Sequence, residues 1–399
     1  MMQNMTRDEQ ERLLGRRVER LLTPDDRAAF GRRVCLITGA GGSVGSELAR
    51  QLAACEPSRL VLLDHSEEGL FRIEQFLTEH APGTPLVPVL CDITRASTVS
   101  RMMDRVRPDV VFHAAAYKHV TMAERHICAS ARVNVLGTCA VLSAAREVGA
   151  RFVLISSDKA ASPRSVMGAT KRFAEITVLS VDDDHATRPV VVRFGNVLAS
   201  SGSFVELMRE RIRDGQPILL TDPDATRFFM TVTEAASLVM KASTIARGGE
   251  TFWLDMGSQV RIGDLADRLL DAAALEGLAR VPIKIVGLRP GEKLCEELAL
   301  QGISLERTAN RQIWVARQAP VQSVLCDAWI RTLRQAVAQD DALGVLKVLT
   351  AAVSDFVPSA EAWELASSVQ PSVAPADRDR PLPGPRQPTA DSQTSSFRH

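Results

Sequence analysis

Six short apolar runs, separated by amphipathic stretches, dominate the first half of the chain. They cover residues 33–38, 59–64, 85–92, 109–116, 151–156 and 189–194. Such continuous runs are typical of strands buried on both faces, and the stretches between them have helical spacing of apolar residues. Strands that alternate with helices predict an α/β fold with a Rossmann-type, doubly wound parallel sheet.

The first run leads directly into a glycine-rich turn. Residues 39–45 read Gly-Ala-Gly-Gly-Ser-Val-Gly, and an apolar helix pattern follows. Glycines allow the backbone to approach a pyrophosphate closely, and the free amides of the helix start receive its negative charge. A glycine pattern alone is weak support, but its place between a strand and a helix predicts a dinucleotide site. The expected contacts are Gly39, Gly42, Ser43, Val44 and Gly45.

The next strands end in residues that suit the rest of a dinucleotide. Asp64 ends the second run, where a carboxylate binds both adenosine ribose hydroxyls, and no arginine follows it. This favours NAD over NADP, although a strand-end carboxylate can also be merely solvated. Asp92 ends the third strand where adenine would lie. Ala114 and Ala115 are small enough for the cofactor to pass, or are packing choices.

The corner after the fifth strand carries the candidate chemistry. The strand Leu154-Ile-Ser-Ser-Asp-Lys-Ala places Ser157, Asp158 and Lys159 at the edge where open α/β sheets bind ligands. Lys171 follows Met167 by four residues, so both side chains share one helix face. A thioether has no proton to exchange. Either the corner is inactive, or Asp158 and Lys159 do the acid and base work; an ion pair between Asp158 and Lys171 is the purely structural interpretation.

Regular alternation ends after residue 195, which suggests several parts. We expect an N-terminal helical segment that docks on another part of the chain, an NAD-binding Rossmann domain, a smaller α/β substrate lobe partly interleaved with it, C-terminal helices and a disordered polar tail. Their expected ranges are 1–30, 31–195, 196–320, 321–368 and 369–399. The tail is rich in Pro, Ser, Asp and Arg and has no apolar periodicity.

Charge and composition exclude several classes of protein. Forty-eight basic residues balance 48 acidic ones, which gives no footprint for nucleic acid. No stretch approaches the roughly 18 apolar residues of a membrane span, and the N-terminus lacks the apolar centre of a signal peptide. A cytoplasmic location is therefore expected. The seven cysteines form no CxxC pair, so we expect reduced thiols and no metal site.

Several motifs in order resemble one family. They begin at Thr38 (TGAGGSVG), His113 (HAAAYKHV), Ser156 (SSDKA), Val166 (VMGATKR), Arg193 (RFGNV), Thr226 (TRFFMT) and Gly287 (GLRPGEK), and the resemblance covers about residues 11–310. The chain resembles the CapD-like polysaccharide-biosynthesis branch of UDP-N-acetylglucosamine 4,6-dehydratases, in the extended short-chain dehydrogenase/reductase superfamily. It looks like a soluble short form, because many members carry membrane spans before this region.

The resemblance implies a lyase with tightly bound NAD. Asp158 would be the acid and Lys159 the base, and Lys171 would bind the nicotinamide ribose. Met167 stands where inverting members have tyrosine, which implies retention of configuration at C5. Asp158, Ser157 acting through water, and Lys171 all remain candidates for taking the proton of the 4-hydroxyl. The resemblance also extends the cofactor contacts to Ile93, Asn134 and Ser156.

The expected substrate is a UDP-sugar, with UDP-GlcNAc favoured. The residues implied by the resemblance are Lys118 and His119 near the sugar and phosphates, and Asn196, Ser203, Arg227, Arg289 and Glu292 toward the UDP half. Thr121 and the pair Ala161-Ser162 depart from the family pattern in substrate-side loops. A C5-inverting dehydratase, a UDP-hexosamine 4-epimerase and a non-enzymatic nucleotide-binding scaffold remain alternatives. Helices within 117–148 and 163–180 are the usual pairing surface, so a homo-oligomer is expected.

Overall fold

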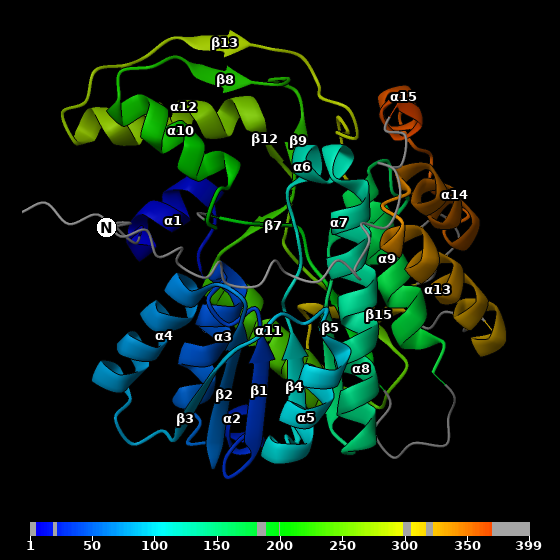
Figure 1. The fold of residues 1–399 in the computed structure, drawn as a ribbon. Coiled ribbons are helices and arrows are strands. Elements are labelled where there is room, and N and C mark those ends of the chain that lie inside the picture. The colour runs from blue at the N-terminus through cyan, green and yellow to red at the C-terminus, as the bar shows by residue number, and fades with distance from the viewer. Residues whose placement is uncertain are drawn as a thin grey trace, which may run out of the picture.

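A nine-stranded sheet forms the centre of the molecule (Figure 1). The computed structural model describes residues 5–18, 22–181, 189–198, 200–297, 305–316 and 322–368. The strands of the sheet are β1 (Val34–Thr38), β2 (Arg59–Asp64), β3 (Leu86–Leu90), β4 (Val110–His113), β5 (Arg151–Ile155), β6 (Val190–Arg193), β11 (Thr251–Leu254), β14 (Glu306–Arg307) and β15 (Ile313–Ala316).

The strand order confirms the predicted doubly wound sheet. The order is β14-β15-β11-β6-β5-β4-β1-β2-β3, parallel from β11 to β3. The strands β15 and β14 add to the β11 edge in antiparallel fashion. Strands β2 and β3 are added on one side of β1, whereas β4, β5 and β6 are added on the other. The strand order therefore reverses between β1 and β4, which opens a crevice at the carboxyl ends of these parallel strands.

Alternate residues of the strands supply two separate cores. Ile37 of β1 packs toward α3 (Ser43–Ala53), α4 (Glu67–His80) and α11 (Val232–Ile245). Leu36 packs toward α5 (Ala96–Val106), α8 (Thr138–Glu147) and α9 (Val166–Leu179). Both residues are fully buried. The continuous apolar runs of the inner strands follow from this arrangement, because both of their faces are covered by helices, whereas the edge strand β3 is partly exposed.

The stretch 117–148, which was expected to be helical, is not one continuous helix. It consists of α6 (Val120–Arg125), α7 (Ile127–Ala131), a π-helical segment η1 (Arg132–Gly137) and α8. His126, between α6 and α7, has φ −125° and ψ 60°, which is not helical. The segment Ile127–Glu147 is long and apolar enough to cross a membrane, but 61% of its most apolar window is buried inside the fold, as in a core helix.

A smaller lobe lies above the carboxyl ends of the strands (Figure 1). It contains α10 (Phe204–Arg213), α12 (Ile262–Leu275) and the strand pairs β7 (Asn196–Val197) with β10 (Phe229–Met230), β8 (Ile218–Leu220) with β13 (Ile283–Ile285), and β9 (Thr226–Arg227) with β12 (Val260–Arg261). The N-terminal helix α1 (Arg7–Leu14) docks here. Leu13 and Leu14 are buried against the lobe, and Arg268 donates to the Leu13 carbonyl at 2.8 Å.

The C-terminal helices cover part of the expected pairing surface. They are α13 (Ser323–Ala338), α14 (Ala342–Ala352) and α15 (Ala360–Ser368), and the first two pack on α7 and α9. Leu333 and Leu346 share one apolar cluster with Ile127 and Phe173. This part of the surface is therefore occupied by the chain itself. The polar tail predicted over 369–399 lies outside the described residues.

Candidate active site

The glycine turn forms a close-fitting cradle at the end of β1. Gly39 has φ +70°, a conformation that favours glycine. A Cβ on Gly41 would lie 2.5 Å from the carbonyl carbon of Gly69, and one on Gly45 would lie 2.0 Å from the Gly39 oxygen. Gly42 caps α3 without a side-chain hydrogen bond, so the first amides of this helix keep their donors for an anion.

Asp64 stands at the edge of this cradle. Its carboxylate is buried and accepts hydrogen bonds from the backbone amides of Gly41, at 2.8 Å, and Ser66, at 2.9 Å. It therefore also fixes the glycine turn, a role that the strand-end position alone does not indicate. Asp92 is exposed and accepts from the Thr94 amide at 2.9 Å.

The alanines after β4 lie beside the turn. A Cβ on Gly39 would come within 2.7 Å of the Ala115 nitrogen and 2.9 Å of the Ala114 carbonyl carbon, so this close approach of two backbone segments requires glycine at 39. Asn134 is fully engaged inside the protein: its amide bonds both backbone groups of Tyr117 and donates to Thr170 at 3.0 Å. Asn134 therefore links the segment after β4 to α9. Ile93 is buried against Gly137.

The corner after β5 brings the three predicted polar residues together. Ser157 caps the 3-10 turn η2 (Asp158–Ala160), where its hydroxyl donates to Asp158 Oδ1 at 2.9 Å and accepts from the Lys159 amide at 3.2 Å. A Cβ on Gly168 would lie 2.3 Å from the Lys159 oxygen, so this glycine lets α9 pack directly on the turn. Gly168 belongs to one of the sequence motifs, but nothing in the motif indicates this packing task.

Asp158 and Lys159 form a buried ion pair. Asp158 is 1% exposed, and Lys159 Nζ donates to its Oδ1 at 3.1 Å and to Asn196 Oδ1 at 3.2 Å. Within the described chain, Asp158 Oδ2 has no hydrogen-bond partner. Burial opposes the charge of Lys159, but the carboxylates of Asp158 and Glu296 outweigh it and raise the pKa of this lysine.

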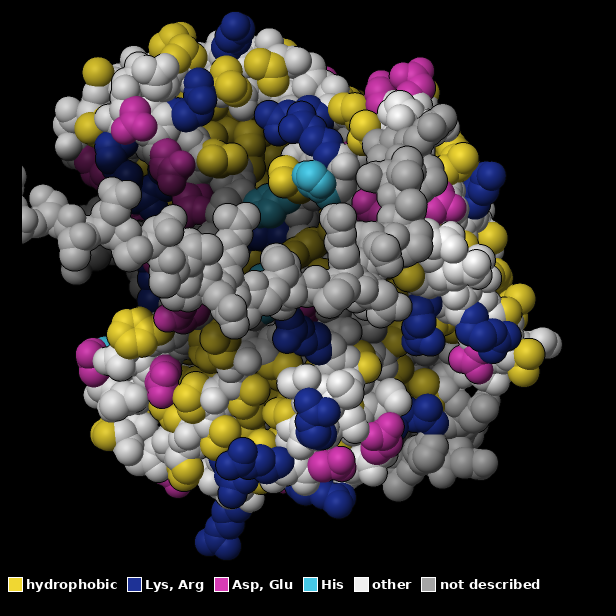
Figure 2. Space-filling model, viewed as in Figure 1, with side chains coloured by type: hydrophobic (Ala, Val, Ile, Leu, Met, Phe, Trp, Pro, Cys, Tyr) yellow, Lys and Arg dark blue, Asp and Glu magenta, His cyan; other side chains and the backbone are white. Residues whose placement is uncertain are grey.

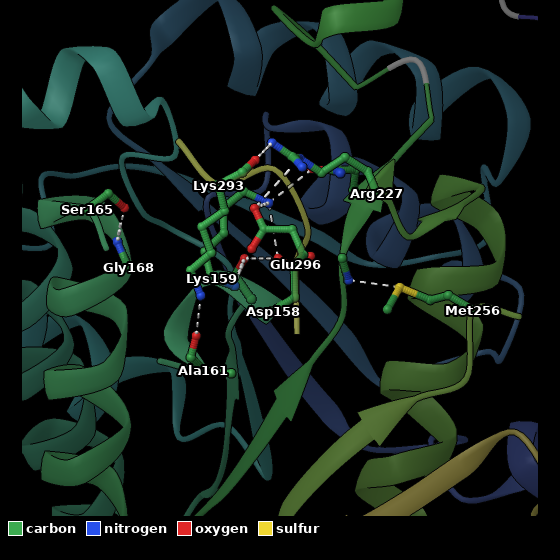
Figure 3. Close-up of polar contacts among 12 residues, drawn as sticks. Asp158, Lys159, Ala161, Ser165, Gly168, Arg227, Met256, Lys293 and Glu296 are labelled. Atoms are coloured by element: carbon green, nitrogen blue, oxygen red, sulfur yellow. Dashed lines mark hydrogen bonds and ion pairs between the residues drawn. The ribbon is translucent and has the colours of Figure 1, made fainter. Parts of the chain in front are cut away.

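Glu296 is the residue of this site that sequence reasoning missed. It is 5% exposed, and its Oε1 lies 3.5 Å from Lys159 Nζ and 3.7 Å from Arg227 Nε (Figure 3). Glu296 lies shortly after the predicted loop of Arg289 and Glu292 and is followed by Glu297. These two consecutive acids were the only feature of the local sequence that could have suggested a site residue. Only the fold shows that the loop reaches the β5 corner.

Arg227, which the resemblance places toward the UDP half of the substrate, bonds the backbone of the distal loop. Its guanidinium donates to the carbonyl oxygens of Thr226, Leu294 and Lys293, at 2.8, 3.0 and 2.6 Å. These bonds fix the loop that carries Glu296. Arg289 and Glu292 lie in that loop as predicted; Arg289 is exposed, and its amide donates to Glu292 Oε2 at 3.2 Å.

Lys171 and Met167 share α9 but differ in surroundings. Lys171 Nζ donates to the Ile155 carbonyl at 2.6 Å, and burial lowers its pKa to about 8, with the Glu175 carboxylate acting in the opposite direction. It makes no ion pair with Asp158, so the purely structural interpretation of that pair was wrong. Met167 is 3% exposed and belongs to the apolar cluster under α13 and α14.

Ser156 points away from the expected cofactor contact. Its hydroxyl donates to Glu175 Oε1 at 2.6 Å. The same carboxylate forms a two-point ion pair with Arg193 and contacts Arg172 at 3.1 Å. Glu175 and Arg193 are fully buried, and the Arg193 guanidinium lies 4.5 Å from the Trp253 ring centroid. This second ionic cluster was not predicted.

The predicted sugar-side residues lie at the boundary of the two parts, where Figure 2 shows the surface hollowed. Lys118 is exposed as a residue; its Nζ donates to the Ser201 carbonyl at 2.6 Å, and partial desolvation of the ammonium lowers its pKa. The Ser201 amide in turn donates to Ser43 Oγ at 2.9 Å, which holds this loop against the glycine turn. Burial also lowers the pKa of His119, and Ser203 caps α10.

Comparison with known proteins identifies the family. The family model described as polysaccharide biosynthesis protein matches residues 35–318. The chain belongs to this family. Its family relatives include the capsular polysaccharide biosynthesis protein CapD of Staphylococcus aureus, which is 42% identical over 302 residues, 74% of this chain and 50% of CapD. The chain spans about half the length of CapD and of the probable polysaccharide biosynthesis protein EpsC of Bacillus subtilis, of which it covers 48%.

Other members link the family to nucleotide-sugar dehydratases and epimerases. The inverting UDP-N-acetylglucosamine 4,6-dehydratase of Campylobacter jejuni is 30% identical over 274 residues, 67% of this chain and 77% of that protein. The solved structure of Pen from Bacillus thuringiensis matches with a TM-score of 0.67 and 29% identity, over 74% of this chain and 92% of Pen. The dehydratase supports membership of the nucleotide-sugar dehydratase and epimerase superfamily, and the structure of Pen supports the fold.

Proposed function

We propose that the chain is an NAD-dependent UDP-N-acetylglucosamine 4,6-dehydratase that retains the configuration at C5. The observation that carries the proposal is the buried pair of Asp158 and Lys159 at the carboxyl end of β5, 3.1 Å apart, beside the glycine cradle. An acid and a base in one site are what a dehydration next to a ketone requires. The C. jejuni relative named above supports this reaction class.

The cradle fits NAD by its shape and its donors. The uncapped start of α3 suits a pyrophosphate, and the Asp64 carboxylate suits the ribose hydroxyls; Gly39, Gly41 and Gly45 allow the tight backbone packing that forms this turn. When bound, NAD supplies the acceptor for the C4 hydride and its later donor to C6. The dTDP-glucose 4,6-dehydratase DesIV of Streptomyces venezuelae, which has the same fold, was solved with NAD bound.

One proton is shared by the catalytic pair. Lys159 Nζ donates to Asp158 Oδ1, so transfer of this proton converts an ammonium and a carboxylate into an amine and a carboxylic acid without any change in the total proton count. The amine of Lys159 then removes the C5 proton, which the 4-ketone acidifies. The carboxylic acid of Asp158 protonates the departing 6-hydroxyl, so one water leaves. The Lys159 ammonium then returns a proton to C5, on the face from which it was removed, as the hydride reaches C6. The proton that the 4-hydroxyl lost in the first step replaces the one given to C5, so the pair ends in its first state.

The neighbours of the pair have defined tasks. Lys171, whose pKa burial lowers to about 8, keeps a positive charge near the crevice at neutral pH and binds the nicotinamide ribose. Met167 has no proton to exchange, which leaves the acid and base work to the pair. Retention at C5 is what the resemblance to the methionine-bearing branch implies. Lys118, His119 and Arg289 hold the UDP-sugar.

Two related activities have specific support. The C. jejuni dehydratase is an inverting enzyme, and a UDP-glucose 4-epimerase of Rickettsia canadensis is 31% identical over 277 residues. Incubation with NAD and either UDP-GlcNAc or UDP-GalNAc separates them. A product lighter by the mass of one water supports a dehydratase, and proton coupling constants give the C5 configuration. A product of unchanged mass would refute the proposal in favour of an epimerase.

A further inference from the structure

The side chain of Glu296 is buried within the ionic cluster of the β5 corner. Oε1 faces Lys159 Nζ at 3.5 Å and Arg227 Nε at 3.7 Å, whereas Oε2 is buried and has no hydrogen-bond partner in the described ranges. Asp158 shows the same pattern with its own Oδ2. Lys159 therefore lies between two carboxylates, each with one unsatisfied oxygen (Figure 3). Buried carboxylates normally have both oxygens satisfied, so this arrangement needs a reason.

The position of Glu296 does not depend on its carboxylate. Its backbone carbonyl accepts from Gln259 Nε2 at 2.8 Å, and Arg227 holds the preceding carbonyls of Lys293 and Leu294. Lys293 Nζ also donates to the Ala161 carbonyl at 3.3 Å, which ties the loop to the β5 corner. A change of the Glu296 side chain should therefore leave the loop in place.

The charges around Lys159 nearly balance. Asp158 and Glu296 bring two negative charges, and Arg227 brings a positive charge from β9. Lys293 adds an ammonium in the same loop. Without Glu296, the buried lysine would face one carboxylate and one guanidinium, and its ammonium form would be less stable. Asn196 Oδ1 is a further, uncharged acceptor for the Lys159 ammonium.

We propose that Glu296 is a positioning residue for the catalytic pair, whose carboxylate holds the Lys159 ammonium between itself and Asp158 and thereby sets the pH range in which the pair works. The inference rests on the proposed function, because it concerns the same acid and base. The pair is active while it carries one proton, so activity falls when it gains a second proton or loses the first. The negative charge of Glu296 stabilises the protonated forms and moves both limits to higher pH.

The variant Glu296→Gln tests this assignment because it removes the charge and keeps the shape. We expect the profile of kcat/KM against pH to move to lower pH by about one unit, as for the loss of one opposite charge near a lysine. Glu296→Asp should restore a profile close to that of the wild type. Glu297→Gln is the matched control, since this neighbouring carboxylate is exposed, and its profile should not move.

A second measurement does not depend on turnover. Lysines methylated with ¹³C-formaldehyde are titrated by NMR, and the Lys159 signal is assigned by its loss in Lys159→Arg. The signal should titrate at lower pH in Glu296→Gln than in the wild type, with thermal unfolding as the control for folding. The inference is overturned if the pH profile of kcat/KM and the titration of Lys159 are the same in Glu296→Gln as in the wild type. If the Lys159 titration moves but the wild type does not dehydrate UDP-GlcNAc, the proposed function fails and the positioning role stands.

Discussion

Two buried ionic clusters lie near the carboxyl ends of β5 and β6, and they differ in how completely their carboxylates are satisfied. In the closed cluster, both oxygens of Glu175 have partners: Ser156 and Arg193 bond Oε1, and Arg193 and Arg172 bond Oε2. Glu175 and Arg193 are 0% exposed. The several charged donors outweigh the cost of burial and lower the pKa of Glu175.

The open cluster uses the same types of residue differently. Asp158 and Glu296 each present one oxygen with no hydrogen-bond partner in the described part of the chain, and Lys159 keeps 20% of its side chain exposed. The difference concerns the carboxylates, because Arg193 Nη1 of the closed cluster also has no hydrogen-bond partner among the described residues. Unsatisfied buried carboxylate oxygens cost stability and can be retained where chemistry needs them. The closed cluster holds the sheet to α9, and the unsatisfied oxygens of the open cluster support the proposal that it is the chemical site.

The largest effect is expected at Asp158. Asp158→Asn keeps the size and removes the acid, so turnover should fall by roughly 10³-fold, within the range for loss of a positioned acid or base. NAD affinity and the midpoint of thermal unfolding should stay close to those of the wild type, because the site is not needed for packing. Product formation measured by mass spectrometry, with calorimetry for NAD, checks this. Wild-type turnover in the variant would remove Asp158 from the mechanism.

The closed cluster should respond in the opposite way. Glu175→Gln leaves two arginines without their counter-charge, so the free energy of unfolding should fall by about 3 kcal/mol, as for a broken buried ion pair. Chemical denaturation measures this loss. Turnover per folded molecule, determined well below the unfolding temperature, should change little. A variant as stable as the wild type would show that the two clusters do not differ in this way.

A smaller effect is expected at Asp64, outside both clusters. Asp64→Asn retains an oxygen for the Gly41 amide but loses the charge that would bind the ribose hydroxyls. We expect NAD to bind about tenfold more weakly, in the range for hydrogen bonds to a charged group, and the discrimination against NADP to shrink. Titration calorimetry with both cofactors measures this. Unchanged affinities would mean that Asp64 serves the glycine turn alone.

The smallest effect concerns another buried carboxyl, Glu124, near the start of α9. Its Oε1 accepts from the Val166 amide at 2.7 Å; burial, opposed by this bond and aided by Glu361, raises its pKa from 4.5 to about 6. Because the folded state favours the neutral acid, this contribution to stability is complete below pH 4.5 and is lost as the pH rises through 6. Discounted for screening, the loss is about 1 kcal/mol.

Glu124→Gln provides the measurement for that group. The variant cannot ionise, so its stability relative to the wild type should rise by the amount given above as the pH passes from below 4.5 to above 6. Urea unfolding at several pH values gives the difference. A constant difference across this range would show that Glu124 does not titrate as its surroundings indicate.

The strands and the cradle were predictable from the sequence because their causes are local. A largely apolar run such as 151–155 is removed from water only if both faces of its strand are covered. The glycines at 39–45 favour a tight turn between strand and helix. The joining of Ser157, Asp158 and Lys159 was predictable because the three are consecutive. The break in the helical stretch after Tyr117 was not predictable from the local sequence. Its π-helical segment contains Asn134, whose side chain bonds the backbone of Tyr117, 17 residues earlier.

The partners of the site residues were less predictable because they come from distant elements. Ser156 was expected to contact a cofactor, but it faces Glu175 on α9. The resemblance implies that Arg227 holds the UDP half of the substrate, but nothing in the sequence indicates that its guanidinium also holds the loop of Lys293. Glu296 has no local pattern that distinguishes it from its neighbour Glu297, and only the packing of the smaller lobe on β5 brings it to Lys159.

The most direct test of the account compares the product of the wild type with that of Lys159→Ala, with UDP-GlcNAc and NAD present. The account predicts that the wild type releases a sugar nucleotide lighter by one water, while the variant leaves the substrate mass unchanged, binds NAD and unfolds at nearly the same temperature. Dehydration by the variant at the wild-type rate would contradict the claim that the open cluster performs the chemistry.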